Sequence, residues 1–250
     1  MIDLRAEFQE HFEEVEAYMG LVTAVEHAAQ SGTPILQTRS GTASTVKPLQ
    51  QKVLCGGVYL HLYNLVEATI SRCVAAVETA ASSAKRWRAD DLSVKLRREW
   101  VRSIARTHEE LSTDHRLRAA IDLCNHLVAM LPAIVKIEKG RGGNWDDIAI
   151  FRFADRIGIP LQLGEAIEAR VKQPYRDNKG ALTLIKCLRN KLAHGEMSFA
   201  ECGDGRSSTE LDELVHLTRD YLEKVISAFE GFVSRYEFLE PEKRPLAGGG

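Results

Sequence analysis

Late in the chain stands the sequence Ala181-Leu182-Thr183-Leu184-Ile185-Lys186-Cys187-Leu188-Arg189-Asn190-Lys191-Leu192-Ala193-His194-Gly195. On a helix that advances about 100° per residue, the apolar side chains of this segment fall on one broad arc. The arc consists of Ala181, Leu182, Leu184, Ile185, Leu188 and Leu192. It predicts a helix with one face in a protein core. Glycine is the usual residue just beyond a helix, so the helix is expected to end at Gly195.

The polar side chains of the same segment lie outside this arc. Arg189 falls at its edge, whereas Asn190 and His194, one i,i+4 step apart, project from the other side. Arg189 and His194 are therefore roughly 140° apart around a regular helix and cannot reach one phosphate together. Either the helix breaks near Gly195, or a second copy of the segment arrives across a dimer interface.

These residue types point to phosphate chemistry without a metal. Arginine carries a permanent, forked charge that suits a phosphodiester, and histidine gives or takes a proton near neutral pH. The alternative is structural: Arg189 pairs with a carboxylate, and His194 caps the helix C-terminus.

Helical periodicity runs through nearly the whole chain, which predicts an all-α fold. The first helix is expected from an N-cap at Asp3 to Gln30, followed by a long loop from Ser31 to Pro48. The second helix should run from Leu49 to Lys85. The last helix should begin at Ser208 or Thr209 with Asp212 as the capping partner and continue to about Tyr236.

The second helix carries an apolar stripe that is expected in the core and that consists of Tyr63, Val66, Ile70, Val74 and Val77. Glu67 lies within about 40° of Tyr63 on that helix, and a buried carboxylate is costly unless a cation meets it. Arg189 is the obvious partner. Alternatively, Glu67 stays solvated at the margin of the core.

The segment from Lys85 to Arg106 is strongly basic. Arg98, Arg102 and Arg106 follow one another at i,i+4 spacing, and with the nearby Trp100 they predict a surface for single-stranded RNA. A solvated helix face with Trp100 buried is the alternative. The net charge of −2 argues against binding by bulk electrostatics, so any contact with RNA should be local.

The stretch from Arg189 to Gly195 resembles the signature of the HEPN superfamily, small helical domains common in bacterial toxin–antitoxin and defence systems. Residues 60–69 and 198–203 also resemble segments of one HEPN-like nuclease group. The similarity extends from about Leu49 to Leu239. It implies a HEPN-like helical bundle with a helical insertion, at about 88–178, between the second helix and the Arg-x4-His helix.

The resemblance implies a metal-independent endoribonuclease that works as a homodimer, with no cofactor. Arg189 would stabilise charge on the phosphate of an RNA substrate, and His194 would act as general acid or base. Asn190 would orient the phosphate or the histidine by hydrogen bonding. Glu67 and Lys191 would support the site. The expected products are 2′,3′-cyclic phosphates and 5′-hydroxyl ends.

An antitoxin, regulator or sensor protein is the expected partner, because a broad ribonuclease would otherwise poison its host. Some members carry a tyrosine that a partner modifies two positions after the histidine. Glu196 stands there in this chain, so that mode of control is doubtful. The alternative function is a non-catalytic interaction or sensor subunit of a defence complex.

Composition fits one globular domain over residues 1–240 with a flexible tail at 241–250, since 250 residues at 44% hydrophobic content can bury a core without disulfides. The five cysteines form no Cys-x-x-Cys pair and the histidines show no metal-ligand spacing, so neither a disulfide framework nor a bound metal is expected. No signal peptide is recognised, and no apolar run approaches the roughly 20 residues that span a bilayer. A cytoplasmic protein without a membrane role is therefore expected.

Overall fold

The computed structural model describes residues 3–37, 41, 43–83, 86–107, 109–139 and 144–245. Its elements are α1 (Leu4–Ser31), β1 (Ile35–Gln37), β2 (Ala43–Thr45), α2 (Pro48–Ser82), α3 (Val94–Ile104), α4 (Thr113–Val128), α5 (Asp147–Ile157), α6 (Glu165–Lys172), α7 (Ala181–Ala193), α8 (Phe199–Gly203), α9 (Ser208–Ser234) and the 3-10 turn η3 (Pro241–Lys243). In the described residues, the regular secondary structure is helical apart from one pair of very short strands, so the all-α prediction is confirmed.

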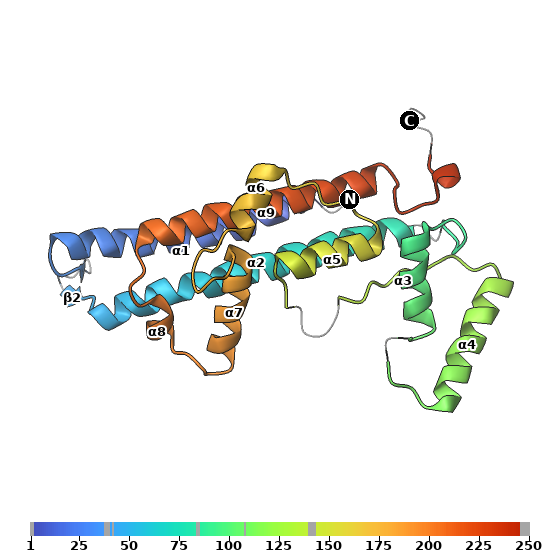
Figure 1. The fold of residues 1–250 in the computed structure, drawn as a ribbon, viewed down its shortest axis with the longest axis horizontal. Helices are drawn as coiled ribbons and strands as arrows, with labels where there is room; N and C mark the ends of the chain where they lie inside the picture. Colours follow the sequence, from blue (N-terminus) through green and yellow to red (C-terminus); the bar gives the residue numbers. More distant parts are fainter. Residues whose placement is uncertain are drawn as a thin grey trace.

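Three long helices, α1, α2 and α9, pack against one another along the length of the molecule (Figure 1). The first begins where the sequence predicts, because the Asp3 carboxylate accepts a hydrogen bond of 3.0 Å from the backbone N–H of Ala6. Its buried positions recur every three or four residues and consist of Leu4, Phe8, Phe12, Val15, Met19, Val22 and Val25. This spacing turns one continuous face of α1 toward the core.

Helix α2 is the central helix of this bundle, in contact with α1, α7, α8 and α9. The stripe predicted from Tyr63 to Val77 is buried in full. Within the described residues, α2 is also the one helix long and apolar enough to cross a membrane, with a mean hydropathy of 1.2. However, 56% of its apolar window is covered by the protein itself. We therefore interpret α2 as the core helix of the bundle.

Helix α8 lies between Gly195 and Ser208, a segment for which periodicity in the sequence predicts no helix. It begins with a capping box, in which the Glu201 carboxylate accepts from the backbone N–H of Ser198 at 2.8 Å. Glycines let it approach α2 closely: a Cβ atom at Gly203 would stand 2.1 Å from the Lys52 carbonyl oxygen, and one at Gly56 would stand 2.1 Å from the Phe199 carbonyl oxygen. The prediction failed because five residues are too short to show helical periodicity.

Other boundaries differ from the predictions. The expected loop before α2 contains the antiparallel pair β1–β2, which is too short for a recognisable alternation. Helix α9 begins at Ser208, one of the two predicted positions, but its N-cap is Ser207 and its capping partner is Glu210 instead of Asp212. The predicted tail starts too early, because Lys243 in η3 forms an ion pair with Asp91 at 3.2 Å. Residues 246–250 of that tail lie outside the described residues.

Helices α3 to α6 occupy the segment predicted as an insertion, and α3 and α4 project from one end of the long helices (Figure 1). Helix α4 buries one residue, Ala119, and contacts α3. Its surroundings expose a series of large apolar side chains: Leu117, Ile121, Leu127, Val128, Met130, Leu131 and Ile134. Patches of this kind mark interaction surfaces more often than isolated exposed residues do.

Candidate active site

Helix α7 carries the Arg-x4-His segment and crosses the direction of α2 (Figure 1). Its predicted apolar arc is buried from Ala181 to Leu188, and Leu192 packs against the core from a half-buried position. The helix ends as predicted. Gly195 has a φ of +70°, and the backbone N–H of Glu196 donates to the Lys191 carbonyl at 2.9 Å. This pattern satisfies the last carbonyls of the helix, as in a Schellman motif.

The Arg189 guanidinium is held from three sides. It lies 4.3 Å above the ring centroid of Tyr63, 3.6 Å from the carboxylate of Glu67, and donates to the Asn190 side-chain oxygen at 2.9 Å. The Glu67–Arg189 pair that the sequence left open is therefore present. The Glu67 side chain is 42% exposed, so the pair orients Arg189 more than it stabilises the fold.

Tyr63 is a contact of Arg189 that the sequence reasoning missed. Its ring is buried in α2, one turn before Glu67, and burial raises the pKa of its hydroxyl. The nearby Glu67 charge raises this pKa further, whereas Arg189 and a hydrogen bond with the Trp145 backbone lower it. The i,i+4 spacing of Tyr63 and Glu67 was the signal that could have linked both residues to one cation.

Asn190 connects α7 to the segment before α5. Its side-chain N–H donates to the Asn144 side-chain oxygen at 3.1 Å. The same two elements are joined a little farther along by Lys186, which pairs with the buried carboxylate of Asp146, and by Thr183, which donates to Asp147 at 3.3 Å. Asn144 borders a glycine-rich stretch, and nothing in the sequence marked it as a neighbour of Asn190.

His194 is the C-cap of α7 and is exposed to solvent. The helix continues without interruption from Arg189 to Ala193 and ends just before Gly195, the position at which the sequence allowed a break. Arg189 contacts Tyr63 and Glu67 of α2, whereas His194 follows the last residue of α7. Lys191 is half-buried between them. The side chains that hold Arg189 are Tyr63, Glu67 and Asn190, and His194 is not one of them.

The arginine stripe of the basic segment does not form as predicted. Helix α3 ends at Ile104, and Arg106 lies beyond it with a φ of +50°, which breaks the i,i+4 series. Arg102 pairs at 2.7 Å with the carboxylate of Glu99, which is buried. Arg98 is exposed on α3, and Trp100 is buried, as the alternative interpretation expected.

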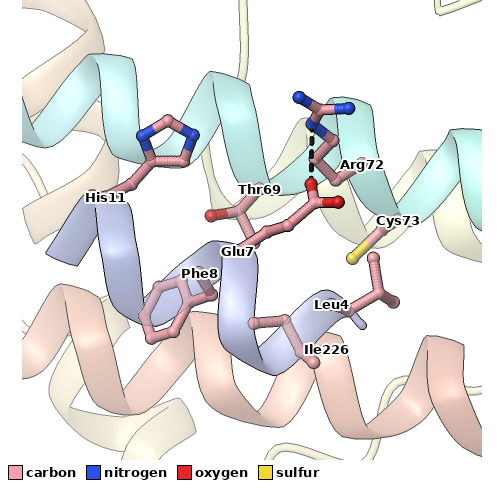
Figure 2. A pocket seen from close by; sticks show the side chains of 8 residues that line it. All are labelled: Leu4, Glu7, Phe8, His11, Thr69, Arg72, Cys73 and Ile226. Atoms are coloured by element: carbon pink, nitrogen blue, oxygen red, sulfur yellow. Dashed lines mark ion pairs between the residues drawn. The ribbon is translucent and has the colours of Figure 1, made fainter. Parts of the chain in front are cut away.

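Two further observations concern other places where a ligand could bind. A cavity of about 10 Å³ lies among α1, α2 and α9, and Figure 2 shows the ion pair between Glu7 and Arg72 on its wall. This volume is about that of one water molecule, so the cavity is a packing defect rather than a substrate site. Within residues 3–245, as far as they are described, no cluster of three His, Cys, Asp or Glu side chains could hold a metal ion.

Comparison with known families identified a family that covers most of the chain. The model of the HEPN_MAE_28990-like HEPN family matches residues 3–238. This match includes α1, whereas the resemblance inferred from the motifs began only at about Leu49. Comparisons with curated proteins and with solved structures gave no match.

Proposed function

The chain belongs to the HEPN_MAE_28990-like HEPN family, and from this premise we propose that it is a metal-independent endoribonuclease acting as a toxin or anti-phage effector. HEPN domains are generally associated with ribonucleases, although some are non-catalytic. The observation that carries the proposal is the fixing of Arg189 by Tyr63, Glu67 and Asn190. A guanidinium held in advance can stabilise charge on a phosphate without reorganising during the reaction.

The proposed reaction is an attack by the RNA 2′-hydroxyl on the adjacent phosphorus. The bond from O2′ to phosphorus forms as the bond to O5′ breaks, which leaves a 2′,3′-cyclic phosphate and a 5′-hydroxyl end. His194 moves the proton taken from O2′ or delivered to O5′. Arg189 stabilises charge on the phosphoryl oxygens, Asn190 orients the phosphate, and Lys191 adds positive charge. DNA lacks the nucleophile and is not cut.

A composite site in a homodimer is part of this proposal. In one chain Arg189 contacts α2, whereas His194 is exposed at the end of α7. An exposed histidine that does not hold the arginine of its own chain can serve the same phosphate through a second copy of the segment. The dimer brings two α7 ends together, so that each subunit supplies residues to one cleft.

A non-catalytic interaction or sensor subunit is the second candidate function. It is favoured by the apolar surface around α4, where Val128 is 85% exposed and Met130 is 61% exposed. Such a surface suits an antitoxin, regulator or sensor protein. The two candidates are compatible if that partner controls the nuclease. We place either form in the cytoplasm.

The first experiment is the incubation of purified protein with total cellular RNA in excess EDTA, followed by mapping of the product ends. Wild type is expected to cut and to leave 2′,3′-cyclic phosphates, whereas His194→Ala and Arg189→Ala are not. Folding of both variants is checked by circular dichroism. Equal cleavage by wild type and both variants would show that the activity comes from elsewhere.

Mixing the two inactive variants tests the composite site. A heterodimer of Arg189→Ala and His194→Ala chains has one intact arginine and one intact histidine in the shared cleft. The mixture is therefore expected to cut RNA although neither variant does so alone. Continued inactivity of a mixture that demonstrably exchanges subunits would contradict a site shared between protomers.

A further inference from the structure

An open pocket of about 230 Å³ lies beside α5, on the side from which Asn144 reaches α7. We call it the α5 pocket. The side chains that matter for its chemistry are Lys139, Asn144, Trp145, Arg152, Phe153 and Arg156. Three of them are cations, and none of the described residues that line the pocket is a carboxylate. A pocket with this composition selects an anion.

The cations of the α5 pocket differ in how they are held. Arg156 is anchored, because it lies 3.3 Å from the buried carboxylate of Glu99 and donates to the Glu138 carbonyl. Glu99 also pairs with Arg102, so a single carboxylate serves two arginines. Lys139 and Arg152 are exposed, and within the described part of the chain neither forms an ion pair. The pocket therefore keeps a positive charge that its own walls do not neutralise.

The α5 pocket is linked to the proposed catalytic site by hydrogen bonds. Asn144 lines the pocket and accepts the hydrogen bond from Asn190, which in turn accepts one from Arg189. The next residue, Trp145, also lines the pocket, and its backbone is hydrogen-bonded to the Tyr63 hydroxyl under Arg189. An anion in the pocket is thus separated from Arg189 by a short chain of side chains.

We propose that the α5 pocket binds a backbone phosphate of the RNA substrate, close to the phosphate that is cut; this inference rests on the proposed function. Lys139 and Arg152 supply exposed positive charge, and Arg156 supplies a guanidinium anchored on the wall.

The same features indicate that the pocket reads the RNA backbone and not the base. Trp145 is 4% exposed and Phe153 is 6% exposed, so neither ring is free to stack on a nucleobase. At about 230 Å³ the pocket is also below the usual range for a site that encloses a whole organic ligand. Binding there should therefore be independent of sequence and strongly dependent on salt.

The test measures binding in the His194→Ala background, where cleavage does not interfere. The probe is a fluorescently labelled single-stranded oligoribonucleotide of mixed sequence, followed by anisotropy over a series of salt concentrations. Arg152→Ala is expected to weaken binding about tenfold, which is the effect of losing one charged hydrogen bond. It should also reduce the slope of log affinity against log salt by about 0.7, the value for one phosphate contact of a single strand.

Arg118→Ala is the matched control, because Arg118 is an exposed arginine on α4, away from the pocket lining. It should leave affinity and salt slope unchanged. Lys139→Ala is a second pocket variant and should act in the same direction as Arg152→Ala. Both replaced side chains are exposed, so circular dichroism is expected to show unchanged folding.

The outcomes for the pocket and for the nuclease can be told apart. Unchanged affinity and salt slope in both pocket variants overturn the pocket proposal, as does a complete failure of the His194→Ala protein to bind RNA. If wild type cuts no RNA while Arg152→Ala loses affinity and Arg118→Ala does not, the pocket stands as an RNA-binding site and the nuclease proposal fails.

Discussion

The close contact between α2 and α8 makes Gly203→Ala a sharp test of the fold next to the proposed site. The new Cβ atom would stand 2.1 Å from the Lys52 carbonyl oxygen and 2.5 Å from the backbone nitrogen of Gly56. Both are backbone atoms of α2, so no side chain can turn away. The helices have to separate by more than about 1 Å before ordinary contact distances, which begin near 3.4 Å, are restored.

The expected cost follows from this geometry. Overpacking costs about 1–3 kcal/mol, and a clash between two backbones belongs at the upper end of that range. We therefore expect the free energy of unfolding to fall by about 3 kcal/mol. In a chain of this size, about 1 kcal/mol corresponds to roughly 2–4 °C, so Tm should fall by roughly 6–12 °C.

Gly20→Ala is the matched control. Gly20 lies within α1, and a Cβ atom added there meets nothing within 4 Å. Alanine is favoured over glycine inside a helix by about 0.5–1 kcal/mol, so Tm should rise by roughly 1–4 °C. Thermal unfolding followed by far-UV circular dichroism measures both variants. A Gly203→Ala protein that melts at the wild-type temperature would refute the α2–α8 contact and with it the placement of the chain after His194.

Three further predictions concern individual side chains. Glu67→Gln should change the free energy of unfolding by less than about 1 kcal/mol, because the ion pair with Arg189 is half-exposed. The same variant should slow RNA cleavage about tenfold, because Arg189 is held less firmly. Unfolding curves measure the first effect and initial cleavage rates the second. Burial raises the pKa of the Cys202 thiol from 9.0 to about 11, although the nearby Arg176 and Arg206 act in the opposite direction. The thiol therefore loses its proton at lower pH in the unfolded chain than in the folded protein. The free energy of unfolding should fall as pH rises from 9.0 to about 11. Urea unfolding across that range should show a smaller loss for Cys202→Ala, and an identical loss in both proteins would exclude this thiol as a cause. Glu99→Ala leaves two arginines without their buried carboxylate and should destabilise the protein by about 3 kcal/mol in urea; an unchanged midpoint would contradict the burial of that charge.

Several features of the fold could be predicted because they depend on residues close together in the sequence. Two apolar patterns predicted helices: the arc from Ala181 to Leu188 and the stripe from Tyr63 to Val77. A helical period of 3.6 residues places such positions on one side of the helix. Asp3 marked the start of α1 through its side-chain oxygen, and Gly195 marked the end of α7 through its left-handed backbone. The predicted stripe of Arg98, Arg102 and Arg106 was wrong because no nearby residue pattern marks the end of α3 at Ile104.

The candidate site could be predicted only in part. The Arg-Asn-to-His segment identified Arg189, Asn190 and His194, and the periodicity of the second helix suggested Glu67. Tyr63 beneath the guanidinium and Asn144 beside Asn190 were missed. The sequence by itself determined the helices, their core-facing sides and the residue types available for chemistry, because periodicity and capping act within a few residues. Only the tertiary structure decided which side chains meet Arg189, which glycines of α2 and α8 touch, and which cations gather beside α5, because those contacts join segments far apart in the chain whose positions depend on how the whole core packs.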